Sequence, residues 1–254
     1  MVDLPTLDEI DAVWLRLMSL LDEHLPLCFS RDEPLEGVLA ATGAALVMKV
    51  ATTGKSMMLL AHCGHETDAE ALLRTQFESF VTLAWIMIDP WKHTLRWEQA
   101  TMEHDHAKFG RMLELGLAQI TAEDLQRSRD LAESQMRPVP GVRAMVDDVN
   151  AHWRGQLGRF SEREDWLVPF VPIVFMAGSE SIHAHIRHIM DSFISAHDDE
   201  WRLGWESITD SAHRSAFLAT IWMNLALCVT ARTFNWPPFN DVISAFEGKD
   251  LTEE

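Results

Sequence analysis

The sequence contains no tyrosine, only three cysteines and no CxxC pair. Cys28, Cys63 and Cys228 lie far apart, and an odd number of cysteines argues against a disulfide framework. The first residues are acidic and lack the apolar stretch of a signal peptide. We therefore expect a cytoplasmic protein without disulfide bonds.

Basic clusters are also missing. No run of five or more Lys and Arg residues occurs, and the formal net charge is −18. A surface this acidic repels phosphate backbones and anionic lipid headgroups. Two apolar stretches, 166–178 and 216–234, are predicted to be core helices, because Pro169 and Pro172 interrupt the first and Arg232 lies in the second. We expect neither nucleic acid nor a membrane as a partner.

Strand signals are nearly absent, whereas helical periodicity runs through most of the chain. At 47% hydrophobic and 24% charged residues the chain can bury a substantial core. Capping boxes, Thr6 with Glu9 and Thr67 with Glu70, are predicted to open two of the helices. The sequence predicts one all-α domain over residues 1–254, a bundle of eight or nine helices. The expected helices cover about 6–25, 35–62, 67–87, 91–115, 121 onward, 141–153, 161–196, 210–234 and a short segment ending at 248.

Tryptophan and methionine are abundant, with ten and thirteen residues. Both fill wide and irregular interiors. Two interpretations are open: a loosely packed helical core, or an apolar pocket for a small-molecule ligand. The sequence is compatible with a homo-oligomer.

The helix expected at 67–87 carries a charged pair on an otherwise apolar face. Arg74 and Glu78 are four residues apart, and the same face continues to Trp85. A buried carboxylate either pairs with a cation or holds its proton more tightly, and the second case suits a proton shuttle. Glu78 is therefore either one half of a structural ion pair or a functional carboxylate, and Trp85 is a candidate contact for a cofactor.

A second candidate group is Glu103 with His106. The two residues form a Glu-x-x-His motif on the helix expected at 91–115. In carboxylate-bridged di-iron bundles this spacing lets both side chains reach one metal, and two such motifs are expected. Only one good copy occurs here. If the protein holds a cofactor, a transition metal is expected, with iron the first candidate. Its ligands would be Glu78, Glu103, His106 and His183.

Three histidines lie close together in the stretch SESIHAHIRHIM, residues 179–190. Helical geometry separates them, since residues four apart share a face, and three histidines at spacings of two and three cannot all converge on one metal from a straight helix. His183 lies with Ser179 on an apolar stripe, His185 at its edge and His188 nearer the polar side. His183 is thus either a buried core histidine or a site residue.

The stretches LLRTQFESFVTLAWIMIDP and VPIVFMAGSESIHAHIRHI together resemble a family of uncharacterised helical proteins, domain of unknown function 5677. In that pattern an Arg-x-x-x-Glu helix with a following Trp pairs with a later Ser-x-x-x-His helix. Here Arg74, Glu78 and Trp85 match the first helix, and Ser179 and His183 match the second. The later tyrosines of the pattern are missing.

The resemblance extends over about residues 35–195, and the helices at 210–247 are expected to pack on that core. It implies that the two patterned helices meet, and it supplies no activity. The leading hypothesis is an enzyme with acid/base or metal-assisted chemistry, in which Glu78 is a base or ligand, Arg74 binds an anionic group, and His183 and Ser179 assist. The alternative is a non-catalytic binding or defence-type module in which the same residues form a structural network.

Overall fold

The computed structural model describes residues 6–24, 34–97, 100–101, 126, 139–157, 161–175, 194–197, 200–203 and 210–234. Helices dominate these residues, which confirms the predicted all-α class. They are α1 (Leu7–His24), α2 (Pro34–His62), α3 (Glu66–Ile86), α6 (Val142–His152) and α9 (Asp210–Phe234). Residues 90–97 and 170–175 are also helical. The predicted bounds of α2, α6 and α9 agree with the structure to within one residue.

One short hairpin departs from the helical expectation. It consists of β1 (Ile194–His197) and β2 (Glu200–Leu203), which pair antiparallel. The prediction of a helix that continues to Ala196 is therefore wrong at its end. Pairing between the strands supplies the backbone hydrogen bonds that a helix would otherwise provide. A four-residue strand is too short for its alternation to stand out from a helical pattern.

The two predicted capping boxes have different outcomes. At the start of α1, the Thr6 N–H donates to Glu9 Oε2 at 2.9 Å, and the Glu9 N–H donates to Thr6 Oγ1 at 3.4 Å, so this box is confirmed. At the second box the helix start predicted at Thr67 is one residue late. Helix α3 already begins at Glu66, and its N-cap, His65, makes no capping bond with its side chain. The chain turns tightly there because Gly64, with φ of +74°, ends α2 in a left-handed conformation.

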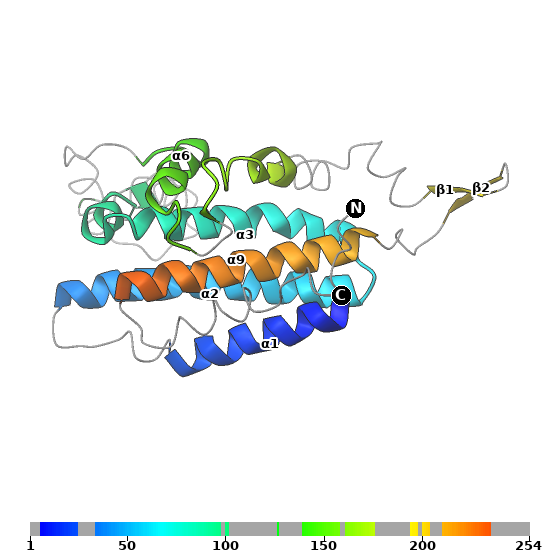
Figure 1. Ribbon diagram of the computed structural model, residues 1–254, viewed down its shortest axis with the longest axis horizontal. Helices are drawn as coiled ribbons and strands as arrows, with labels where there is room; N and C mark the ends of the chain where they lie inside the picture. Colours follow the sequence, from blue (N-terminus) through cyan, green and yellow to red (C-terminus); the bar gives the residue numbers. More distant parts are fainter. Residues whose placement is uncertain are drawn as a thin grey trace.

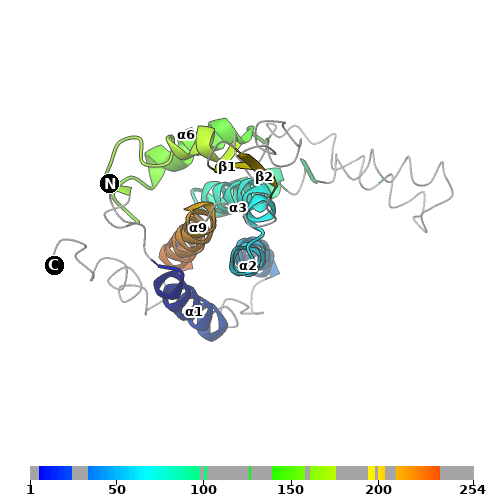
Figure 2. The same cartoon turned by 90° about the vertical axis from the view of Figure 1, so that its right-hand side faces the viewer.

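Helix α3 lies between two layers of the structure. On one side it packs against α2 and α9, which also pack against each other, and α1 packs against α9. On the other side α6 covers α3 (Figures 1 and 2). Helices α2 and α3 run antiparallel across the short turn that joins them (Figure 1). The face of α3 that looks away from α2 and α9 is thus the face that residues 139–175 cover.

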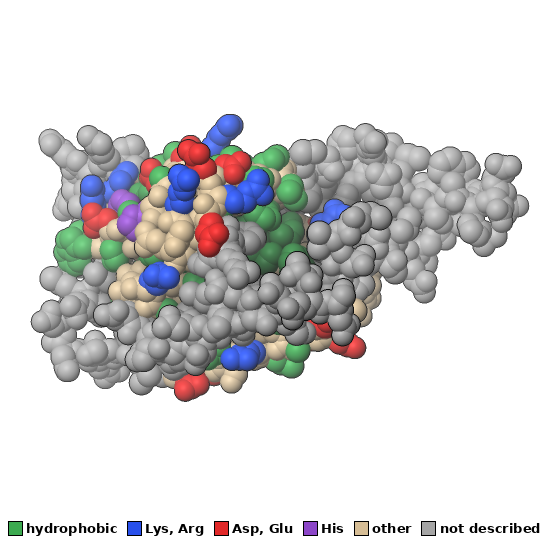
Figure 3. Space-filling model, in the orientation of Figure 1, with side chains coloured by type: hydrophobic (Ala, Val, Ile, Leu, Met, Phe, Trp, Pro, Cys, Tyr) green, Lys and Arg blue, Asp and Glu red, His purple; other side chains and the backbone are tan. Residues whose placement is uncertain are grey.

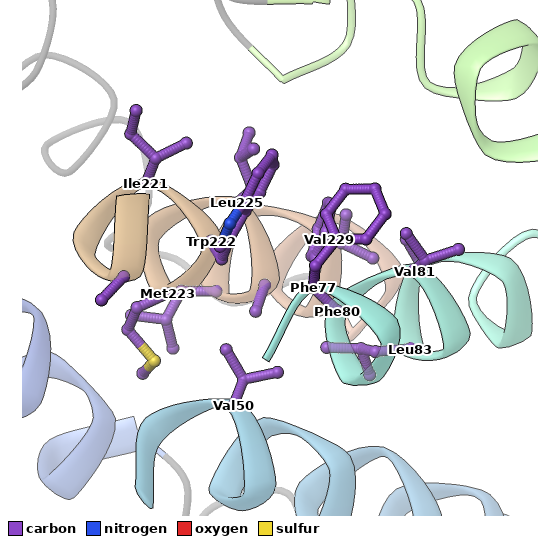
Figure 4. Close-up of a cluster of buried hydrophobic side chains, with 14 of the residues drawn as sticks. Val50, Phe77, Phe80, Val81, Leu83, Ile221, Trp222, Met223, Leu225 and Val229 are labelled. Atoms are coloured by element: carbon purple, nitrogen blue, oxygen red, sulfur yellow. The ribbon is translucent and has the colours of Figure 1, made fainter. Parts of the chain in front are cut away.

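Aromatic side chains fill the centre of the core (Figure 4). The fully buried indole of Trp222, on α9, contacts the rings of Phe77 and Phe80 on α3, with centroids 5.0 and 5.5 Å away. We call the residues that cover α3, 139–175, the covering segment. From this segment the ring of Phe170 contacts the same indole, with centroids 5.0 Å apart. Offset and edge-to-face pairs of this kind add to the stabilisation from apolar burial. Trp222 therefore serves the core, and Trp14, Trp85, Trp153 and Trp166 are buried in it as well.

A buried glutamine holds α3 against its two neighbours. The Gln76 side chain is inaccessible, and its Nε2 donates to the carbonyl oxygens of Val50 on α2 and Ala219 on α9, at 3.2 and 3.1 Å. The helices come this close because residue 54 is a glycine. A Cβ there would lie 2.5 Å from both Gln76 Nε2 and Trp14 Cη2.

Two helices are long and apolar enough to cross a membrane, Ala41–His62 within α2 and Arg214–Phe234 within α9. Of these windows, 56% and 72% are buried inside the structure. Buried core helices pass the same test of length and composition, so the observation is weak evidence for a membrane span.

Replacing Gly54 with Ala should destabilise the protein by about 1–3 kcal/mol, because the added methyl group meets two side chains that cannot easily move. Urea unfolding measures the loss. Gly43→Ala is the matched control, since its Cβ would meet the flexible end of Met87, and we expect a clearly smaller loss. Equal effects of the two substitutions would contradict the proposed role of Gly54.

Candidate functional site

The predicted residues of α3 lie on one helical face. Arg74 and Glu78 are four residues apart, and Trp85 follows Arg74 by eleven, close to three full turns. At 1.5 Å per residue, Arg74 and Trp85 are about 16 Å apart along the helix axis. The face therefore carries two separate polar groups.

The first group is the ion pair of Arg74 and Glu78. Arg74 Nε donates to Glu78 Oε1 at 2.8 Å, and the side chains are 38% and 33% exposed. Glu78 is thus not the buried carboxylate that the apolar stripe suggested. Of the two interpretations, the geometry supports a paired carboxylate within reach of solvent.

Arg74 is also held from the covering segment. Its Cζ lies 4.6 Å from the centroid of the Phe175 ring, a cation–π contact. Residues 170–175 therefore reach the N-terminal half of α3, where the resemblance implied that a later helix meets it. Ser179 and His183 lie outside the described residues. Nη1 and Nη2 of Arg74 have no hydrogen-bond partner among the described residues.

The second group surrounds Trp85, whose indole is completely buried. The indole N–H donates to Asp148 Oδ2 on α6 at 3.2 Å. The ring of His93 stacks on the indole, parallel to it, with centroids 3.9 Å apart. Because the indole itself is inaccessible, a ligand at this end of α3 would contact Asp148 and His93 and not Trp85.

His93 and Trp153 cap the C-terminus of α3. The last carbonyl groups of a helix have no partners within the helix. Trp153 Nε1 donates to the carbonyl oxygen of Ala84 at 3.0 Å, and His93 Nδ1 lies 2.7 Å from the carbonyl oxygen of Trp85. Because a carbonyl oxygen only accepts, Nδ1 of His93 must carry the proton. The other nitrogen of the neutral ring, Nε2, is then an acceptor.

A pocket of about 460 Å³ opens to solvent beside this cap. Among the described residues it is lined by Ile88, His93, Asp148, Ala151 and His152. In Figure 3, histidine side chains lie at the surface over this end of α3 and α6, beside both basic (Lys, Arg) and acidic (Asp, Glu) side chains. Sequence reasoning missed this site because its members come from two segments and share no motif. The Asp-Pro break at 89–90 with a histidine three residues later was the available signal for a side-chain cap.

The predicted metal ligands are only partly described. Glu78 is paired with Arg74, whereas Glu103, His106 and His183 lie outside the described residues. Within the part of the chain that the structure describes, no group of three or more His, Cys, Asp and Glu side chains is arranged to hold a metal ion. His62, which the sequence analysis did not assign, pairs with Asp11 of α1 at 2.9 Å.

These features define a helical protein with accessible polar groups along one face of its central helix. The chain belongs to the DUF5677 family, a family of unknown function, whose match covers residues 41–200. The resemblance inferred from the Arg74 and His183 patterns is thereby confirmed. No curated protein and no solved structure matches the chain.

Trp153→Phe should destabilise the protein by roughly 2 kcal/mol, because it removes both the hydrogen bond to Ala84 and buried aromatic volume. Urea unfolding measures the difference. Trp91→Phe is the control, since Trp91 is 43% exposed and should change stability by less than about 0.5 kcal/mol. Similar losses for both variants would show that the cap contributes nothing specific.

Proposed function

We propose that the protein is a cytoplasmic enzyme that acts on a small, negatively charged molecule bound at Arg74. The proposal assigns the chain to one helical domain of eight or nine helices, with the site on the face of α3 that residues 139–175 cover. The observation that carries it is the guanidinium of Arg74, which is oriented by two contacts and has no partner on Nη1 or Nη2 among the described residues.

The two contacts suit an anion-binding arginine. Glu78 accepts from Nε and Phe175 lies under the guanidinium plane, so the terminal nitrogens keep their N–H groups for a ligand. A guanidinium fork matches a carboxylate or a phosphate in two parallel hydrogen bonds. Orientation before binding lowers the entropic cost of ligand capture.

The chemistry would be acid/base catalysis on the bound molecule. Glu78 bonds Arg74 through Oε1 and keeps Oε2 without a partner among the described residues, so it is a carboxylate directly beside an anion on Arg74. Ser179 and His183, which follow Phe175 along the chain, are proposed to complete the site as acid, base or nucleophile.

The alternative remains a non-catalytic binding or defence-type module, in which Arg74, Glu78, Ser179 and His183 form a structural polar network. What supports the functional proposal over this one is that Nη1 and Nη2 of Arg74 have no partner among the described residues, so the pair with Glu78 leaves hydrogen-bond donors for a ligand.

Arg74→Ala should abolish anion binding with little loss of stability. A set of phosphorylated and carboxylated metabolites is tested for binding by thermal shift and then by calorimetry. We expect at least one anionic compound to bind the natural protein, and Arg74→Ala to weaken it at least about tenfold, since a charge-assisted hydrogen bond contributes about 1.5–3 kcal/mol.

The control for this experiment is Arg16→Ala, which removes an exposed arginine of α1 and should leave affinity unchanged. Glu78→Gln distinguishes the two roles of Glu78: unchanged affinity with lost turnover supports a proton acceptor. The proposal fails if no anion binds, or if Arg74→Ala binds as tightly as the natural protein.

A metal-dependent version of the same proposal uses Glu78 with Glu103, His106 and His183 as ligands and iron as the first candidate. It predicts a stoichiometric transition metal in protein purified without chelator. Elemental analysis tests this directly, and a metal content far below one equivalent contradicts the metal-dependent version without affecting anion binding at Arg74.

A further inference from the structure

The pocket at the C-terminal end of α3 is separate from the site proposed at Arg74. Helix geometry places Trp85, beneath this pocket, about 16 Å along the axis from Arg74. The pocket volume, about 460 Å³, is in the range that small organic ligands occupy. No residue of the Arg74 site lines it among the described residues.

Two polar groups of the pocket, Asp148 and His93, present hydrogen-bond acceptors. Asp148 uses Oδ2 to accept the indole N–H of Trp85, and Oδ1 has no partner among the described residues. His93 donates from Nδ1 to a backbone carbonyl group, so Nε2 of the neutral ring has a lone pair and, among the described residues, nothing to bind it. His152 lies one turn after Asp148 on α6 and lines the same pocket.

These acceptors are held in place by the fold. The cap on α3 and the stacking on Trp85 orient His93, and the indole hydrogen bond orients Asp148. The remaining walls, Ile88 and Ala151, are apolar. An anionic carboxylate beside neutral acceptors, between apolar walls, matches a small ligand that carries positive charge and several N–H donors.

The surroundings favour a cation as well. The chain has a net charge of −18, which concentrates cations near its surface. Among the described residues His93, Asp148 and His152 are not arranged to hold a metal ion, which favours an organic cation.

We propose that this pocket binds a small organic cation of the amidine, guanidine or amine class, with Asp148 as the charged acceptor and His93 Nε2 as a second acceptor. This site is independent of the anion site proposed at Arg74, so the failure of one proposal leaves the other unaffected.

The NMR resonance of the Trp85 indole N–H reports on ligand binding at Asp148, because this N–H donates a hydrogen bond to Asp148. Its resonance in a ¹H–¹⁵N spectrum is assigned by its loss in Trp85→Phe. Titration with benzamidinium chloride should shift this resonance with saturation. Benzamide, which has nearly the same shape without the charge, should cause no saturable shift.

Asp148→Asn should weaken benzamidinium binding at least about tenfold, because the amide keeps an oxygen for the indole but loses the charge. Asp147→Asn is the matched control: Asp147 is the exposed neighbour on the same helix, does not line the pocket, and should bind as the natural protein does. The proposal is overturned if benzamidinium causes no saturable shift, if benzamide acts equally well, or if Asp148→Asn keeps the natural affinity. A saturable shift with zinc chloride but none with benzamidinium would also overturn it.

Discussion

The close contact of α3 with α2 and α9 determines how the rest of the structure is arranged. Gln76 donates to carbonyl oxygens of both neighbours, and Gly54 provides the space for it. With one side of α3 occupied in this way, only its opposite face remains for residues 139–175. Polar residues on that face therefore lie at a boundary between two layers, where they are ordered by packing and still reach solvent.

The covering segment docks on α3 through hydrogen bonds as well as through apolar contacts. Trp153 donates to the carbonyl oxygen of Ala84, and the Trp85 indole donates to Asp148. His93, from the residues that directly follow α3, bonds the carbonyl group of Trp85. Asn150 organises the next turn of the segment, accepting from the N–H of Leu167 at 3.0 Å. Capping and pocket formation are thus linked through His93, which bonds a carbonyl group at the end of α3 and also lines the pocket.

Much of the fold follows from local patterns in the sequence. Helices α2, α6 and α9 have clear ends in the sequence, so their predicted bounds agree with the structure to within one residue. The errors arise where tertiary contacts compete with local signals. Thr67 belongs to a convincing capping box, yet the Gly64 turn starts α3 one residue earlier. The short hairpin at 194–203 depends on pairing between segments, which periodicity does not report.

The candidate site was predictable to a smaller extent. Spacing placed Arg74 and Glu78 together, but the apolar stripe wrongly suggested that Glu78 is buried, because exposure depends on how the covering segment docks. His93 and Asp148 come from different segments and meet only through the end of α3. The protonation of His93 tests this account most directly. A long-range ¹H–¹⁵N NMR spectrum of the neutral histidines should show the His93 proton on Nδ1, with Nε2 unprotonated. A proton on Nε2 would contradict the cap on α3 and the acceptor that the pocket requires.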